Sequence, residues 1–288
     1  MRRPLSEISN PALGQPLGAR SCNGPMSIPL QAVEEDLDLP RRRPKPRRSG
    51  ISVLIDPGAA TGLFEDVIDS HAPLIDFVKF GWGTALVTHE LARKITCLRR
   101  NDVEFFFGGT LFEKFVLQGR FDGFRSFCYR HGCRWVEVSN GTIPMSAAEK
   151  TACVAALSGD FEVVSEVGFK DVARSGELAP ADWVRCIRDD LDAGASLVLT
   201  EARESGRSGI CTPDGRPRVE VIDAILGCDV DVRRIVFEAP TKELQTYFVR
   251  RVGMDVNLAN VAMADIVGLE TLRLGLRADT LVEGLEIA

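Results

Sequence analysis

Short apolar segments rich in β-branched and aromatic residues recur along the chain from Gly50 onward. Each is too short for a typical helix and is bounded by polar or glycine-containing sequence, which indicates a β-strand. The segments are nearly apolar throughout, as strands covered on both faces are, and this favours a parallel sheet. They lie at 51–56 (ISVLID), 74–83 (LIDFVKFGWG), 103–110 (VEFFFGGT), 134–141 (RWVEVSNG), 162–168 (EVVSEVG), 196–204 (SLVLTEARE), 234–240 (RIVFEAP) and 255–260 (DVNLAN).

Helical patterns separate these segments. Ser146 is followed three residues later by Glu149, which is the spacing of a capping box at the start of a helix. Apolar residues three or four positions apart mark further helices, and a glycine follows two of these stripes. The stripes are Leu91, Ile95 and Leu98; Trp183, Ile187 and Leu191 before Gly194; and Leu244, Phe248 and Val252 before Gly253.

Strand and helix alternate eight times over about 240 residues, which is typical of a closed (β/α)8 barrel, the TIM barrel. A doubly wound open sheet is the alternative, but its first turn usually reads G-x-G-x-x-G, and DPGAATG at 56–62 differs from it. We therefore predict an α/β fold with a single barrel domain over residues 47–288.

The beginning of the chain differs in kind from the rest. Residues 1–46 are rich in Pro, Gly and Ser without a sustained period, and the basic run PRRRPKPRR covers 40–48. Such a composition buries too little apolar surface to offset the entropy of ordering. We predict a mostly disordered leader whose last residues could pack where the barrel begins. Its basic cluster could also dock an acidic partner or a polyanion.

Composition narrows the class of protein further. The 288 residues carry a formal net charge of −6, and 45% of them are apolar, so nucleic acid is not the expected partner. No run of about 18 apolar residues is present, so we expect no membrane span. Eight cysteines are scattered without a C-x-x-C pair. This favours free thiols over a metal site or disulfides, and a cytoplasmic location.

Polar residues gather where the predicted strands end. In a (β/α)8 barrel the active site is built at the carboxyl ends of the strands, so these side chains are expected at one mouth. Residues two or four apart on an extended strand share a face, which pairs Glu137 with Ser139, Glu166 with Lys170 and Glu201 with Arg203. The strand-end residues are Asp56, Lys79, Gly108, Gly109, Thr110, Glu137, Ser139, Asn140, Glu166, Lys170, Glu201, Arg203, Glu204, Glu238, Asn257 and Asn260.

The mixture of charges indicates the chemistry. A purely structural ring of charges at one barrel end would be costly. Several carboxylates would repel one another, so a divalent cation is expected, and oxygen ligands suit Mg²⁺ held by one or two carboxylates plus substrate oxygens. Lys79, Lys170 and Arg203 are then free to hold anions. The Gly108–Gly109 pair would let backbone N–H groups approach an anionic oxygen, although a plain tight turn explains it equally well. The residues predict a metal-dependent barrel enzyme for a small, multiply anionic substrate.

Longer motifs carry a family resemblance from about Lys45 to Thr280. DFVKFGWGT, GGTLFEK, VEVSNGTIPM, SEVGFKD, TEARESG, FEAPTKELQ, VNLANV and LETLRLGLRADT, taken together and in this order, resemble the phosphosulfolactate synthase family. The resemblance implies a (β/α)8 barrel that adds sulfite to phosphoenolpyruvate with Mg²⁺ and gives (R)-2-phospho-3-sulfolactate. That product feeds coenzyme M biosynthesis or sulfolactate production.

The resemblance also assigns roles to residues. Lys170, in SEVGFKD, is implied as the proton donor, and cationic neighbours or desolvation by substrate are expected to lower its pKa enough for this role. Lys79 and Arg203 would complete the catalytic set, and Glu137, Glu166 and Glu201 are the candidate metal ligands. The candidate substrate-binding residues are Gly108, Gly109, Thr110, Ser139, Ser205, Gly206, Asn257 and Asn260.

Departures from the family pattern leave alternatives open. Asn140 stands where some members carry Asp, and Phe169 where methanogen members show a second Lys. The family also has a plant heat-stress-associated branch that need not run this reaction. A phosphoenolpyruvate lyase with another nucleophile, such as a thiol, and a non-catalytic stress-associated barrel are therefore the alternatives. A helix stripe such as LETLRLGLR could supply a homo-oligomer interface or could pack within the barrel.

Overall fold

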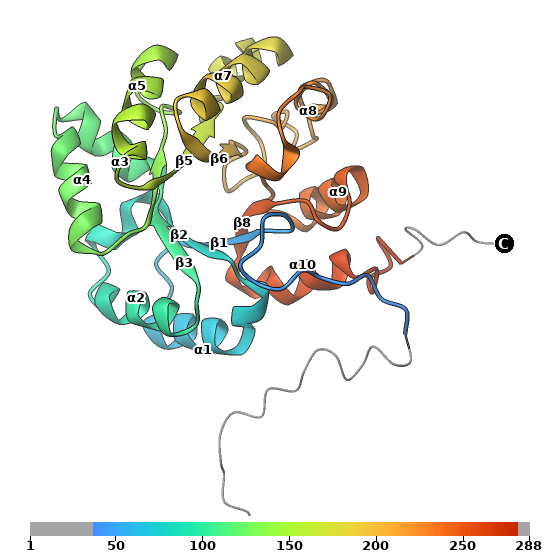
Figure 1. The fold of residues 1–288 in the computed structure, drawn as a ribbon. Helices are drawn as coiled ribbons and strands as arrows, with labels where there is room; N and C mark the ends of the chain where they lie inside the picture. Colours follow the sequence, from blue (N-terminus) through green and yellow to red (C-terminus); the bar gives the residue numbers. More distant parts are fainter. Residues whose placement is uncertain (1–36, 282–288) are drawn as a thin grey trace, which may run out of the picture. The chain divides into compact units, whose positions relative to one another are not determined.

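The computed structural model describes residues 37–281, so the predicted disorder of residues 1–36 lies outside the described part of the chain. Strands and helices alternate around a barrel (Figure 1). The strands are β1 (Ser52–Asp56), β2 (Phe77–Phe80), β3 (Glu104–Phe107), β4 (Trp135–Val138), β5 (Glu162–Val167), β6 (Ala195–Thr200), β7 (Ile235–Glu238) and β8 (Leu258–Ala262). All eight predicted strands are confirmed.

Helices follow the strands and cover the outside of the sheet (Figure 1). They are α1 (Thr61–His71), α2 (Leu91–Arg100), α3 (Gly109–Leu117), α4 (Phe121–Arg130), α5 (Ala147–Ser158), α6 (Val172–Glu177), α7 (Pro180–Asp192), α8 (Val219–Leu226), α9 (Lys242–Val252) and α10 (Ile266–Arg273). Short 3₁₀ turns are η2 (Ala72–Leu74), η3 (Gly81–Leu86), η4 (Val232–Arg234) and η5 (Met263–Asp265).

The sheet is parallel throughout, with the strand order β3-β2-β1-β8-β7-β6-β5-β4. β3 and β4 end this order and lie next to each other across a seam. Trp135 on β4 packs edge-on against Phe77 on β2 across this region, with ring centroids 4.9 Å apart. The fold is therefore the predicted TIM barrel, nearly closed.

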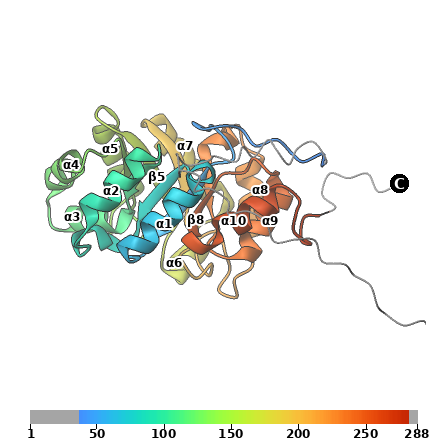
Figure 2. The ribbon, with the colours of Figure 1, turned by 90° about the horizontal axis from the view of Figure 1, so that it is seen from below.

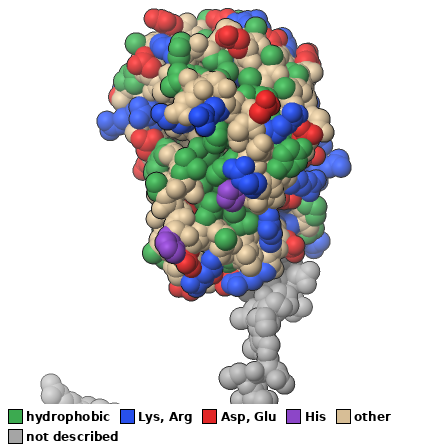
Figure 3. All heavy atoms as spheres, turned by 90° about the vertical axis from the view of Figure 1, so that its left-hand side faces the viewer, with side chains coloured by type: hydrophobic (Ala, Val, Ile, Leu, Met, Phe, Trp, Pro, Cys, Tyr) green, Lys and Arg blue, Asp and Glu red, His purple; other side chains and the backbone are tan. Residues whose placement is uncertain are grey.

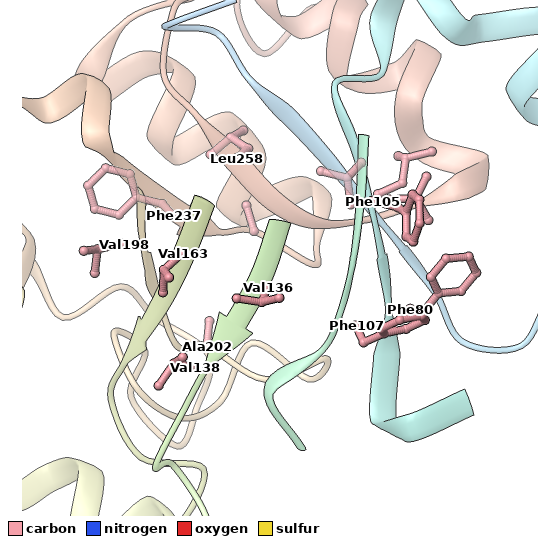
Figure 4. Close-up of a cluster of buried hydrophobic side chains, with 14 of the residues drawn as sticks. Phe80, Phe105, Phe107, Val136, Val138, Val163, Val198, Ala202, Phe237 and Leu258 are labelled. Carbon is pink, nitrogen blue, oxygen red and sulfur yellow. The ribbon is translucent and has the colours of Figure 1, made fainter. Parts of the chain in front are cut away.

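Alternation along the strands divides the residues between the interior and the outer core. The outward-facing side chains pack under the helices, among them Phe80, Phe107, Val138, Val198 and Phe237 (Figure 4). Apolar side chains that face the barrel interior form a separate cluster. Its members are Ile51, Val53, Phe77, Phe106, Val164, Leu197, Leu199, Val236 and Ala259. The lower interior of the barrel is thus filled with apolar side chains, as in other closed barrels of this size.

The predicted helix signals are also found. Ser146 accepts a hydrogen bond from the N–H of Glu149, and the Glu149 carboxylate accepts one from the N–H of Ser146, so the capping box at the start of α5 is complete. The stripe residues of α2, Leu91, Ile95 and Leu98, are all buried against the sheet. In α9, Leu244 and Phe248 are likewise buried, and the helix ends before Gly253.

Residues 39–50 have no helix or strand, yet their basic side chains contact the barrel. Arg42 pairs with Glu270 at 2.9 Å, and Arg47 pairs with Asp76 at 3.0 Å. Figure 2 shows this segment in blue along one end of the barrel, with α6 at the opposite end. Part of the basic cluster is therefore neutralised by the barrel's own carboxylates.

Two expectations from composition can be compared with the described residues. None of their helices combines the length and the apolarity that a membrane crossing requires. The seven described cysteines are all free, and Cys97, Cys128, Cys133 and Cys211 are buried, as expected for core thiols.

Candidate active site

Lys79 is the centre of a buried ion cluster at the carboxyl ends of the strands. It is the third residue of β2 and points inward, above the apolar layer that contains Phe77. Its ammonium lies 3.1 Å from Glu137 Oε2, 3.3 Å from Glu166 Oε2 and 3.3 Å from Glu238 Oε1. These three glutamates come from β4, β5 and β7, so one lysine joins four strands across the interior.

Lys170 is a second cation beside the same cluster. It follows β5, and its ammonium lies 2.7 Å from Glu166 Oε1 and 3.2 Å from Glu201 Oε2. Glu166 therefore bridges the two lysines through its two carboxylate oxygens. The Lys170 side chain is 24% exposed, against 8% for Lys79, so Lys170 is the one that solvent can reach.

Backbone groups and a hydroxyl hold the carboxylates in place. The N–H of Gly109, at the start of α3, donates to Glu137 Oε1 at 2.6 Å. Ser139 Oγ lies 2.7 Å from Glu166 Oε1 and 2.8 Å from Glu113 Oε1, which is on α3. Carboxylates that are hydrogen-bonded in this way have little freedom to move, so the cluster is preorganised.

Gly109 is required by close packing. A Cβ atom at this position would lie 2.4 Å from the Ser139 Cβ and 2.6 Å from Glu137 Oε1. At Gly108 the same atom would lie 3.2 Å from the Lys79 Cε. The glycine pair thus allows α3 to begin directly beside the ion cluster, and the N–H of Gly109 is already bonded to Glu137.

Burial and mutual charge shift the pKa values of the cluster. Burial opposes the positive charge of Lys79, but Glu137, Glu238 and Glu166 outweigh it and raise the lysine pKa. Burial likewise opposes the charge of Lys170, and Glu166 and Glu201 reverse its effect and raise that pKa as well. The lowered pKa expected for Lys170 is therefore wrong in this arrangement, because its nearest neighbours are anions.

The four carboxylates divide into two kinds. Burial would raise the pKa of Glu166, but Lys170 and Lys79 hold it well below its ordinary value, so Glu166 is ionised. Burial raises the pKa of Glu137 to about 8, against an ordinary value of 4.5. Burial also raises the pKa values of Glu201 and Glu238, and repulsion from Glu166 adds to the effect. The cluster thus limits its negative charge by retaining protons.

A small hollow opens above the cluster, and its rim holds unusual backbone conformations. The volume of the hollow is about 30 Å³, close to that of one water molecule. Trp82, Arg203 and Asn260 border it, and each has a positive φ, of 49°, 59° and 55°. Left-handed backbone at bulky residues is costly and concentrates at functional sites. Asn260 lies where the β1–β8 register shifts, a bulge that turns its side chain toward the mouth.

Most of the predicted site residues come together around this hollow. The predicted strand-end residues that border it are Lys79, Gly108, Gly109, Thr110, Glu137, Glu166, Lys170, Glu201, Arg203, Glu204, Glu238 and Asn260. Ser139 lies directly beneath, bonded to Glu166. Glu201 and Arg203 meet through the backbone, since the N–H of Arg203 donates to Glu201 Oε1 at 2.6 Å.

The prediction that Asn257 lies at the mouth and binds substrate is wrong. β8 begins one residue later, at Leu258, so Asn257 lies at the amino end of the strand. Its side chain accepts from the N–H of Ile51 and donates to the carbonyls of Arg233 and Ile235, at the starts of β1 and β7. Asn257 therefore ties strands together at the end opposite the site.

Two further predicted residues do not reach the hollow. Ser205 is exposed, and Gly206 packs near Leu244 of α9 instead of bordering the ion cluster. The chain turns away after Arg203, so the extended pairing assumed for this segment ends there. Asp56, at the end of β1, also points away and pairs with Lys94 of α2 at 2.6 Å.

Glu238 was expected at the mouth but received no role in the site, and Glu113 was not expected there. Glu238 ends β7 and was visible as a strand-end carboxylate, the same signal that selected Glu137. Glu113 gave no such signal, because it lies on α3, one turn after Gly109. Only the fold brings it to Ser139.

The donor atoms fit a magnesium ion only in part. The described residues contain no group of three or more His, Cys, Asp or Glu side chains placed to hold a metal by themselves. Both oxygens of Glu166 face lysine ammonium groups. Glu201 Oε2 lies 3.2 Å from the Lys170 ammonium, and Asn260 Oδ1 is a buried oxygen without a hydrogen-bond partner among the described residues. These two fit the mode in which Mg²⁺ takes few protein ligands and completes its shell with substrate oxygens and water.

An ion cluster at the carboxyl mouth of a (β/α)8 barrel defines this protein as a barrel enzyme. The sequence model of the (2R)-phospho-3-sulfolactate synthase (ComA) family matches residues 40–279. The chain therefore belongs to this family, and with it to the carbon–sulfur lyases.

Relatives of known name agree with this assignment. The chain is 49% identical over 244 residues to the phosphosulfolactate synthase of Bacillus subtilis, covering 85% of this chain and 97% of that protein. It is 40% identical over 251 residues to the phosphosulfolactate synthase of Methanothermobacter thermautotrophicus, covering 85% and 96%. Among solved structures, the carboxyl transferase domain of Rhizobium etli pyruvate carboxylase superposes with a TM-score of 0.50 at 11% identity, over 77% of this chain and 41% of that one. This likeness concerns the fold alone.

Proposed function

We propose that the protein is a phosphosulfolactate synthase that adds sulfite to phosphoenolpyruvate and gives (R)-2-phospho-3-sulfolactate. The observation that carries the proposal is the cation set at one mouth, Lys79, Lys170 and Arg203, beside buried carboxylates in a chain of this family. Both substrates are anions, and three cationic side chains around one hollow match that charge.

The chemistry places definite demands on the site. The sulfur lone pair of sulfite forms a bond to the terminal methylene of the enol phosphate, and the double-bond electrons move to the neighbouring carbon and its carboxylate. A proton must then reach that carbon from one face, and the phosphate ester stays intact. The site must therefore hold a carboxylate and a phosphate, stabilise growing negative charge, and deliver one proton.

Lys170 is the proposed proton donor. Its raised pKa keeps the ammonium loaded at neutral pH, and a carbanion next to a carboxylate is far more basic than an amine. Glu166 Oε1, 2.7 Å away, fixes the position of the ammonium. Exposure of 24% leaves Lys170 accessible from the hollow, as a proton donor must be.

Lys79 and Arg203 are proposed to hold the anionic groups. Lys79 is a fixed positive charge beneath the hollow, and it meets developing negative charge without rearrangement. Arg203 stands at the rim with its side chain 43% exposed, where its guanidinium can receive a phosphate in fork geometry. Gly108 and Thr110 line the same hollow and complete the binding surface.

Mg²⁺ remains part of the proposal. Asn260 and Glu201 are the residues that would hold it, because Asn260 Oδ1 is buried without a hydrogen-bond partner among the described residues and Glu201 Oε2 faces only the Lys170 ammonium, at 3.2 Å. When bound, the ion supplies a Lewis acid for the substrate carboxylate.

One experiment separates this proposal from its alternatives. Purified protein is incubated with phosphoenolpyruvate and Mg²⁺, with sulfite, with a thiol, or with neither, and the enol absorbance is followed. Loss of absorbance with sulfite alone, together with a sulfonated product by mass spectrometry, supports the synthase. Turnover with a thiol instead would indicate another nucleophile, and no turnover with any would indicate a non-catalytic barrel.

The cellular setting and the assembly stay predictions. Coenzyme M or sulfolactate production in the cytoplasm follows from the family resemblance alone. For a homo-oligomer, the side of the molecule on which α3 and α4 lie gathers hydrophobic side chains between charged ones (Figure 3). On these helices Leu117 and Tyr129 are 59% and 53% exposed. Light scattering of the full chain would give the number of subunits.

A further inference from the structure

A large cavity lies at the end of the barrel opposite the ion cluster. Its volume is about 690 Å³, within the range of small-molecule pockets. The starts of β2, β3 and β4 form one side of it, and residues 45–47 of the amino-terminal segment form another. None of the residues around the catalytic hollow borders it, so the two sites are separate.

Aromatic rings form the floor of this cavity. Phe77 and Trp135 meet edge to face there, and Val103 adds apolar surface beside them. Trp135 is partly exposed, whereas its Nε1–H is buried and donates to no acceptor among the described residues. The part of Trp135 that is exposed is therefore its ring, and this ring is the surface that the residue offers to the cavity.

The charged residues around the cavity are unequally partnered. Arg47 is held by both oxygens of Asp76, and Arg134 faces Glu104 at 3.3 Å. Lys45 and Arg99 form no ion pair with any described residue: the Lys45 ammonium donates to the carbonyl of Ala72 at 3.2 Å, and the Arg99 guanidinium donates to the carbonyls of His131 and Gly132.

Lys45 is the half-buried one of these two cations, whereas Arg99 is exposed to solvent, so Lys45 is the cation that we assign to a ligand. Burial lowers its pKa, with Asp76 acting in the opposite direction, and an anion placed against it would restore favourable charge. Two of its three ammonium hydrogens remain free for such an anion. A ligand that places an anionic group at Lys45 and also lies against the apolar rings must have one charged end and one flat apolar end.

We propose that this cavity binds a small organic monoanion with an aromatic ring. The ring lies against Phe77 and Trp135, and the anionic group accepts hydrogen bonds from Lys45 Nζ. The site is independent of the proposed synthase reaction, because it uses none of the residues at the catalytic mouth.

Anilinonaphthalene sulfonate, an aromatic monoanion, is the probe for this site. Titration of the full-length protein, followed by dye fluorescence and by calorimetry, is expected to show saturable one-to-one binding. Lys45→Gln should weaken the affinity about tenfold, the usual worth of a charged hydrogen bond. Trp135→Phe keeps a smaller ring at the cavity, so a smaller loss is expected. Arg41→Gln removes an exposed arginine of the same segment that does not border the cavity, and should bind as the parent does.

The outcomes separate this cavity from other sites. A neutral naphthylamine without the sulfonate should bind at least about tenfold more weakly if Lys45 supplies the anion contact. The absence of saturable binding would overturn the proposal. So would an affinity for the dye in the Lys45→Gln and Trp135→Phe proteins that equals the affinity of the parent protein. Displacement of the dye by phosphoenolpyruvate would also overturn it, because the dye would then lie at the catalytic mouth. Thermal unfolding of each variant checks that its fold is intact.

Discussion

Lys170 and Lys79 are both lysines of one cluster, yet they should respond differently to removal. Lys170 is partly exposed and follows a strand, whereas Lys79 is buried inside the barrel between three carboxylates. The first position is suited to proton delivery and the second to holding the cluster together. Activity and stability measurements on matched variants can distinguish these roles.

Lys170→Ala should remove turnover and leave the fold. A positioned general acid contributes about 10²–10⁴-fold to the rate, so sulfite-dependent loss of phosphoenolpyruvate should fall by at least that range. Because the side chain is 24% exposed, solvent can partly compensate Glu166 and Glu201. Glu166 and Glu201 are almost fully buried, so urea unfolding should show a loss that is part of the about 3–5 kcal/mol typical of a broken buried ion pair, while circular dichroism shows an intact fold. A variant with parental turnover would assign the proton donor to another residue.

Lys79→Met should destabilise the protein. Its removal leaves Glu137, Glu166 and Glu238 without their shared cation in a buried site. Breaking a buried ion pair typically costs about 3–5 kcal/mol, and protonation of the carboxylates would recover part of it. Urea unfolding at neutral pH should therefore show a loss of this order, smaller at lower pH. Unchanged stability would mean that the carboxylates do not depend on Lys79.

At the scale of elements, the start of α3 should be the least tolerant position of the mouth. Gly109→Ala places a methyl group 2.4 Å from the Ser139 Cβ, so α3 or β4 must move and the bond from Gly109 to Glu137 is strained. We expect at least a tenfold loss of kcat with a stability loss of about 1–3 kcal/mol, as for overpacked cores. Gly62→Ala in α1 is the control, because nothing lies within 4 Å of its added Cβ. Parental activity in Gly109→Ala would show that this junction can relax.

The elements also show which features sequence patterns can and cannot predict. The eight strands were predictable because buried parallel strands are short apolar runs, and the capping box located the start of α5. Strand boundaries were less certain, and a one-residue difference at β8 moved Asn257 to the opposite end of the barrel. The segment after Glu201 was read as extended, but Arg203 adopts a left-handed conformation that no propensity signals.

At the scale of the whole molecule, the sequence predicted one mouth correctly but assigned its charge balance to a metal. The expected repulsion among carboxylates is relieved by Lys79, which comes from a strand on the far side of the barrel interior. Glu113 shows the same limit, because a helix residue reaches Ser139 only after the barrel closes. Contacts of this kind depend on topology, and a single sequence does not contain the register that sets them.

The protons retained by the cluster should appear in the stability of the whole fold. The folded pKa of Glu137 is about 8 and its ordinary value is 4.5, so between these pH values the folded state holds a proton that the unfolded state loses. Stability should therefore fall as pH rises through this window, by about 1.4 kcal/mol per pH unit for each such proton. Glu201 and Glu238 act in the same direction.

Glu137→Gln tests the assignment. Glutamine cannot ionise, so urea unfolding across the same window should show a shallower decline than in the parent protein. Glu149→Gln is the comparison, because Glu149 lies at the exposed capping box of α5 and its pKa is lowered by its bonds to Ser146. An identical slope in the Glu137→Gln and parent proteins would locate the retained protons elsewhere.

The apolar layer beneath the ion cluster determines how substrates and product can enter and leave this barrel. Leu199, Phe106 and their neighbours fill the interior below the lysines and glutamates, so within residues 37–281 the hollow opens only toward the carboxyl mouth. Substrates and product must therefore use the same opening of the barrel. The product has to dissociate before the next pair of substrates can bind. A product that dissociates slowly would therefore inhibit competitively with respect to both substrates.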